Sequence, residues 1–137
     1  MSTRPPRLTF TMELRVQVGP PVEIGAVASG RRRIVPIRGG TFEGPQLRGE
    51  VLDGGADWQI VGDEGLTQLD TRYTLKTDRG ELIYIQNAGL RHAPPELSAR
   101  LLAGEPVDPS LVYFRTVPVF ETAAPDLQWL TLSLIHI

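Results

Sequence analysis

The sequence has no cysteine and only two histidines in 137 residues. Without cysteine the chain forms no disulfide, no thiolate nucleophile and no cysteine-ligated zinc site, and this absence favours a cytoplasmic location. Because His136 lies in a terminal segment of doubtful origin, His92 is the one histidine left as a base for a nucleophilic triad. A metal site needs three or four convergent ligands, and no such spacing occurs. We therefore expect neither a metal site nor a nucleophilic triad.

Long apolar runs and a strong charge of one sign are also missing. No stretch reaches the ~18 apolar residues that a membrane-spanning helix requires. The opening residues, MSTRPPRLTF, lack the apolar run of ~7–15 residues found in a secretory signal. A formal net charge of −2 gives no general attraction to nucleic acid or to an anionic membrane. We expect neither as a partner.

Glycine and proline are frequent, at 14 and 12 residues, and glycine is densest in the stretch 39–59, GGTFEGPQLRGEVLDGGADWQ. Glycine weakens a strand unless the backbone bends or approaches another chain closely. We interpret this stretch as the bulged corners of a curved sheet that closes into a barrel with a ligand-sized lumen. Its glycine pairs match neither a phosphate-binding loop nor a dinucleotide fingerprint, so we expect no cofactor.

Alternation of apolar and polar residues predicts many short strands. The clearest is 8–18, and 67–77 with 81–86 form a predicted hairpin. Further strands are expected at 22–28, 31–37, 41–43, 46–52, 57–61, 112–122 and 128–137. A short helix is expected over 94–104, which begins with prolines and ends in glycine. The pattern predicts one all-β domain over 1–137, an antiparallel closed barrel of about eight strands with one helix, after a loose tail at 1–6.

Several segments are informative together. They are GRRRIVPI at 30–37, GGTF at 39–42, GGADW at 54–58, LDTRY at 69–73, YFRT at 113–116, PVFE at 118–121 and WL at 129–130. In this order and spacing they resemble the UPF0311 family, also called the DUF3237 domain, from about Leu8 to Leu130. The resemblance implies a small β-barrel of the calycin or allene-oxide-cyclase-like kind, mostly bacterial and fungal, without an assigned function.

The last residues depart from that family. The segment 132–137, LSLIHI, looks like translated sequencing-adapter sequence, and we expect it to be non-native. The family is expected to continue there with a further strand. Since LSLIHI is itself strand-like, it could imitate that strand by chance.

Asp57, Arg115 and Glu121 are the candidate catalytic residues. Arg115 alternates with Tyr113 and Val117, so its guanidinium enters the lumen if that apolar face points inward. A buried arginine must be paired, and Glu121 on the same face or Asp57 on another strand could pair with it. Either Arg115 holds a ligand oxygen while a carboxylate moves a proton, or the pair only stabilises the barrel. Both interpretations stay open.

Trp58, Tyr73, Tyr84 and Arg33 are the candidate ligand-binding residues. Each aromatic ring offers a flat apolar surface with one polar tip, although core packing explains such residues equally well. Tyr73 shares a strand face with Thr71, and the pattern alone does not tell which face is the lumen. For Arg33 a solvated strand face is the simpler explanation.

These features predict a barrel that binds a small, largely apolar molecule bearing a carbonyl or carboxylate. If it is an enzyme, the available groups favour a cofactor-free isomerase, cyclase or lyase. One alternative is a carrier barrel without turnover. Another is a structural protein whose strand faces build a homo-oligomer.

Overall fold

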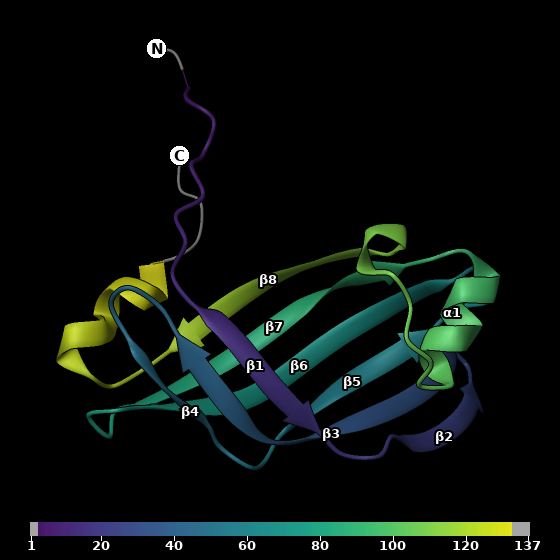
Figure 1. Ribbon diagram of the computed structural model, residues 1–137, viewed down its shortest axis with the longest axis horizontal. Helices are drawn as coiled ribbons and strands as arrows, with labels where there is room; N and C mark the ends of the chain where they lie inside the picture. The colour runs from purple at the N-terminus through teal and green to yellow at the C-terminus, as the bar shows by residue number, and fades with distance from the viewer. Residues whose placement is uncertain (1–2, 133–137) are drawn as a thin grey trace.

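The computed structural model describes residues 3–132, and most of them lie in one antiparallel sheet (Figure 1). Its eight strands are β1 Glu13–Val18, β2 Val22–Val27, β3 Gly30–Glu43, β4 Arg48–Val51, β5 Ala56–Val61, β6 Leu66–Thr77, β7 Leu82–His92 and β8 Tyr113–Glu121. The helical segments are the α-helix α1 Pro95–Leu102 and the 3₁₀ segments η1 Pro109–Leu111 and η2 Pro125–Leu132. The all-β prediction is confirmed, and α1 lies within the predicted helix.

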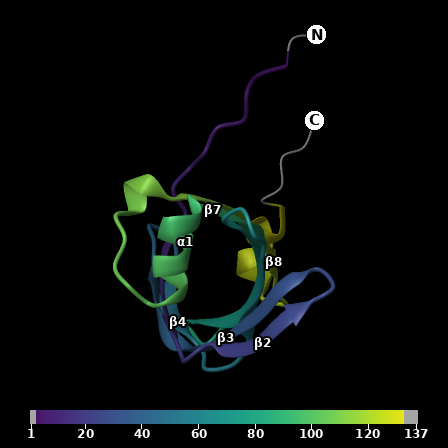
Figure 2. The ribbon, with the colours of Figure 1, turned by 90° about the vertical axis from the view of Figure 1, so that its right-hand side faces the viewer.

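The hydrogen-bonded ladders of β3, β4, β6 and β5 form a closed circuit, which we call the ring. Both β4 and β5 pair with β3 on one side and with β6 on the other, so they act as one long strand interrupted at 52–55. The other four strands lie outside this ring: β1 and β2 pair with β3, β7 pairs with β6, and β8 pairs with β7. Seen along its length in Figure 2, the sheet curls strongly, as glycine-bent antiparallel sheets do.

The two outermost strands of the hydrogen-bonded order are β1 and β8, and no ladder joins them within residues 3–132. Helix α1 lies at one end of the long axis and η2 at the other (Figure 1). A hydrogen bond of 3.3 Å from Arg33 Nη2 to the carbonyl oxygen of Leu102 ties the last turn of α1 to β3. The interior of the curled sheet therefore has one end under α1 and one end beside η2.

The hydrophobic core occupies the η2 end of the interior. Its buried members come from β3, β4, β6, β7, β8 and η2, and include Ile37, Phe42, Val51, Tyr73, Leu75, Ile83, Ile85, Phe120, Leu127 and Leu130. Alternate residues of each strand supply this cluster, as expected for a sheet with one buried face. Met12, Leu14 and Val16 pack against it from the N-terminal side.

Glycine allows β1 to lie against the bend of β3. Gly40 has a φ of +140°, and a Cβ there would collide with the carbonyl oxygen of Arg15. The sequence predicted separate strands at 31–37 and 41–43, with Gly39 and Gly40 between them. That prediction is wrong, because β3 runs through both glycines as one strand of 14 residues.

Both ends of the described chain differ from the prediction. Residues 8–12 are not a strand. The last residue of β3, Glu43, pairs with Glu13, the first residue of β1, so no strand partner remains for 8–12. Leu8 is 99% exposed. Residues 128–132 belong to η2 rather than to a last strand, and 133–137 lie outside the described residues. No helix within residues 3–132 is long and apolar enough to cross a membrane.

Candidate functional site

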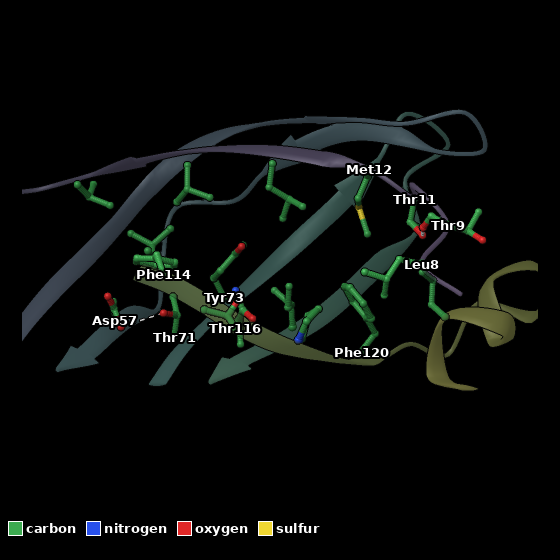
Figure 3. Close-up of a pocket in the computed structure, with 18 of the residues that line it drawn as sticks. Leu8, Thr9, Thr11, Met12, Asp57, Thr71, Tyr73, Phe114, Thr116 and Phe120 are labelled. Carbon is green, nitrogen blue, oxygen red and sulfur yellow. Dashed lines mark hydrogen bonds between the residues drawn. The ribbon is translucent and has the colours of Figure 1, made fainter. Parts of the chain in front are cut away.

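The interior face of the sheet surrounds a cavity of about 850 Å³ (Figure 3). Its wall includes side chains of β1, β3, β5, β6, β7, β8 and η2 and of the segment 7–12. The apolar lining residues are Leu8, Met12, Leu14, Val16, Val18, Val35, Ile37, Ile85, Phe114, Pro118, Phe120, Trp129 and Leu130. Ligand pockets are commonly about 300–1,000 Å³ and mostly apolar, so this cavity has the size and lining of one.

A polar cluster lies at one end of the cavity, and three of its members form a row. Asp57 of β5 is paired with Thr71 of β6, which is paired with Asn87 of β7. The Thr71 hydroxyl donates a hydrogen bond of 2.8 Å to Asp57 Oδ1, and Gln59 Nε2 donates one of 2.7 Å to Asp57 Oδ2. Figure 3 shows Asp57, Thr71 and Thr116 at this end, opposite Leu8 and the N-terminal segment. The carboxylate is thus held in place by a donor on each oxygen.

Tyr73 lies on the same face of β6, two residues beyond Thr71, and also lines the cavity. Only 6% of its surface is exposed, and burial raises the pKa of its phenol to about 12. The hydroxyl therefore keeps its proton at neutral pH. It can donate a hydrogen bond to a ligand oxygen.

Further polar groups lie between this row and α1. The side chains of Arg33, Gln59 and Thr67 are buried there, and Arg91 is half-buried. Four buried atoms of this region and of the row make no hydrogen bond within residues 3–132: Arg33 Nε, Gln59 Oε1, Thr67 Oγ1 and Asn87 Oδ1. Arg33 Nε is 3.2 Å from Glu23 Oε1, near enough for an ion pair but not aligned for a hydrogen bond. Each unsatisfied buried group costs about 1–3 kcal/mol.

Two predicted catalytic residues lie on the opposite side of the wall. Arg115 and Glu121 are exposed on the outer face of β8, because Phe114, Thr116 and Phe120 take the interior positions. The guanidinium of Arg115 donates a hydrogen bond of 2.7 Å to the carbonyl oxygen of Phe114 and lies 5.2 Å from the centroid of the Tyr113 ring. The sequence placed Arg115 in the lumen only if that apolar face pointed inward, and the structure places the face outward. Both faces of β8 carry apolar residues, so alternation alone did not determine which face is inside.

Trp58 and Tyr84 are also outside the interior cavity. On β5 the side chain of Asp57 points inward, so that of Trp58 points outward. On β7 the side chain of Ile85 points inward, so that of Tyr84 points outward. Both aromatic residues border a depression of about 400 Å³ on the outer wall, next to Arg72. As candidate ligand-binding residues they therefore belong to this outer depression and not to the interior cavity.

Asp57 and Tyr73 line the cavity, as the sequence allowed. Arg33 is 7% exposed, so its expected place on a solvated face is wrong. No residue group within 3–132 has the composition and proximity to hold a metal ion.

The sequence interpretation missed Asn87 and Arg91, because it ended the second strand of the hairpin at Gln86. Strand β7 continues to His92, paired with β6 throughout and with β8 from Tyr84 onward. The alternation that places Ile83 and Ile85 inside places both missed residues inside as well. Extending that pattern beyond Gln86 could have found them.

The fold and the site define a mostly β protein whose curled antiparallel sheet surrounds an interior cavity. Residues 6–135 match the family model described as "Protein of unknown function (DUF3237)". A UPF0311 protein of Rhodopseudomonas palustris (strain TIE-1) is 44% identical over 121 residues, which cover 88% of this chain and 79% of that protein. A UPF0311 protein of Bradyrhizobium diazoefficiens is 42% identical with the same coverage. The chain belongs to the UPF0311, or DUF3237, family.

Solved structures share this architecture. A crystal structure of a protein of unknown function from Rhodopseudomonas palustris aligns with a TM-score of 0.80 at 41% identity, covering 90% of this chain and 85% of that one. A protein from Acinetobacter baumannii described as "beta-barrel like" aligns with a TM-score of 0.71 at 43% identity, covering 93% and 84%. These similarities establish the fold and family and assign no ligand.

Proposed function

We propose that this protein binds a small, largely apolar molecule bearing a carbonyl or carboxylate group inside its curled sheet. One observation carries the proposal: the 850 Å³ cavity is apolar over most of its wall and ends in the polar row of Asp57, Thr71 and Asn87, with Tyr73 next to this row. An apolar wall supplies affinity through burial, and a few convergent polar groups fix the orientation of a ligand. The calycin or allene-oxide-cyclase-like assignment belongs to this proposal. Its support is the curled antiparallel sheet around the cavity.

A second candidate is cofactor-free proton transfer, favoured by the way Asp57 is held. Its carboxylate lines the cavity with one donor on each oxygen, from Thr71 and Gln59. Such a group could take a proton from the carbon beside a ligand carbonyl while Tyr73 donates a hydrogen bond to the enolate oxygen that forms. In a ligand with a double bond between the β and γ carbons, returning the proton to the γ carbon of the dienolate moves the double bond to the α,β position and so isomerises the ligand. Arg115 and Glu121 have no part in this scheme, because they lie outside the cavity.

The neutral naphthyl ketone prodan tests both candidates, since its emission reports an apolar environment and its propionyl group carries exchangeable protons beside the carbonyl. We expect saturable binding with blue-shifted emission. Thr116→Phe, which places an aromatic ring inside the cavity, should weaken binding, whereas Val117→Phe on the outer face of β8 should not. For turnover, the protein should accelerate deuterium uptake by the propionyl group in D₂O, and Asp57→Asn should remove the acceleration while prodan stays bound.

Urea unfolding shows whether each variant keeps its cooperative fold, and Val16→Phe narrows the same cavity from β1. Absence of prodan binding by the unmodified protein would contradict the binding proposal. Equal binding by Thr116→Phe, Val16→Phe and Val117→Phe would also contradict it, because the dye would then lie on the outer surface. Binding without accelerated exchange would exclude proton transfer for this ketone and leave a carrier.

A further inference from the structure

Arg91 brings a positive charge to the α1 end of the interior. Its register places it between Thr67 on β6 and Phe114 on β8, and Phe114 lines the polar end of the cavity (Figure 3). It lies on the inward face of β7, in alternation with Ile85 and Asn87. The side chain makes no ion pair and no hydrogen bond within residues 3–132. A half-buried guanidinium in this position lacks the partner that such groups normally have.

The nearby acidic groups are already engaged elsewhere. Asp57 accepts hydrogen bonds on both oxygens from Thr71 and Gln59. Glu23 is divided between Arg31, at 3.1 Å, and Arg33, at 3.2 Å. Burial and the like charge of Arg33 lower the pKa of Arg91, and the charge of Asp57 offsets this only in part. Binding an anion would therefore relieve a local excess of positive charge.

The chemistry of the site distinguishes between anions. A phosphate monoester carries about −1.5 to −2 charges and is usually bound by several cations or by a run of backbone amides. Here the Asp57 carboxylate lines the same end of the cavity and would repel a dianion. A carboxylate carries one charge, and its two oxygens match the fork of one guanidinium. The apolar lining around Ile85 and Phe120 then suits the remainder of the molecule.

We propose that the ligand is a carboxylate and that Arg91, the ladder neighbour of Phe114, binds its charged group at the α1 end of the cavity. This inference rests on the proposed binding function and adds the charge and the orientation of the ligand. Asn87 lines the cavity in one row with Asp57 and Thr71, and the NH₂ group of its amide is a hydrogen-bond donor for a carboxylate oxygen. The apolar part of the ligand extends toward the η2 end.

Displacement of bound prodan by a matched pair of compounds tests this inference. At pH 7, 2-naphthylacetate is an anion and 2-naphthylacetamide is its neutral counterpart. We expect the unmodified protein to bind the carboxylate at least ~10-fold more tightly, the order of one charge-assisted hydrogen-bonded pair. Arg91→Met should remove this preference and leave amide binding within about twofold. Arg91→Lys should keep part of it, because the charge remains without the fork.

Arg115→Met is the matched control, because Arg115 follows the direct ladder partner of Arg91 but lies on the outer face. It should leave the preference unchanged. Equal affinity of the unmodified protein for both compounds would overturn the inference without the use of any variant. An equal preference in Arg91→Met and Arg115→Met would overturn it too. In either case prodan binding by the unmodified protein would still support the proposed function, whereas absence of prodan binding would refute that function itself.

Discussion

Strand β6 passes through both ends of the interior, and its inward face differs between them. Leu75, at the η2 end, is 0% exposed and belongs to a continuous apolar cluster with Ile83 and Phe120. Thr67, at the α1 end, is equally buried, but its hydroxyl has no hydrogen-bond partner within residues 3–132. These two positions of one strand are equally buried, but burial of the Leu75 side chain stabilises the fold, whereas burial of the unpaired Thr67 hydroxyl destabilises it.

This difference indicates a division of labour along the strand. Apolar burial at the η2 end stabilises the fold, whereas unsatisfied polar atoms at the α1 end reduce stability. Natural proteins commonly break the rule that buried polar groups are satisfied at the places where they bind ligands. Arg91 and the charged group of the proposed ligand belong to the less stable end. The comparison therefore predicts mutations whose effects differ in size and in sign along the interior.

The largest effect is expected at the apolar end. Leu75→Ala removes a fully buried side chain from the core, which typically costs about 2–5 kcal/mol of unfolding free energy. Urea unfolding followed by circular dichroism measures this loss. Leu82→Ala is the control, because Leu82 is 54% exposed on β7. A loss below about 1 kcal/mol in Leu75→Ala would show that the η2 end does not provide the stability assigned to it.

A pair of threonines on β6 tests the polar end with one chemical change. Thr67→Val removes a buried hydroxyl without a partner, so we expect stability to stay equal or to rise by up to about 1–2 kcal/mol. Thr71→Val removes the 2.8 Å hydrogen bond to Asp57 and should cost about 1–3 kcal/mol. Urea unfolding without added ligand compares them. Equal losses in both variants would mean that the Thr67 hydroxyl has a stabilising partner.

Local alternation predicted much of the fold. It located all or part of every strand and the helix, and it identified Asp57 and Tyr73 as candidates that the structure places in the cavity. These successes depend on patterns within single strands, where residues two apart share a face. The glycine-rich stretch 39–59 does mark the bends, although Gly39 and Gly40 lie inside one strand.

The failures depend on pairing between strands. Residues 8–12 alternate as well as β1 does, but their potential partner ends at Glu43. Arg115 was a candidate for the lumen because Val117 and Val119 resemble a core face, although Phe114 and Phe120 occupy the inner positions. Arg91 was missed because pairing with β6 and β8 extends β7 to His92, beyond the end at Gln86 that the sequence pattern indicated. The sequence pattern specifies the faces of a strand, whereas its neighbours decide which face is inside and where the strand ends.

The smallest predicted effect concerns Tyr73, which lies between the two ends. Burial raises its pKa from 10.0 to about 12, so above pH 10 the unfolded chain loses the phenol proton while the folded protein keeps it. This contribution to stability is complete below pH 10 and is lost progressively as the pH rises toward 12. The loss amounts to about 1 kcal/mol at pH 11.

Because other groups also titrate there, urea unfolding at pH 9 and pH 11 is compared between the unmodified protein and Tyr73→Phe. Tyr73→Phe should lose about 1 kcal/mol less over this interval, and identical losses would show that the Tyr73 hydroxyl is in contact with water rather than buried beside the cavity.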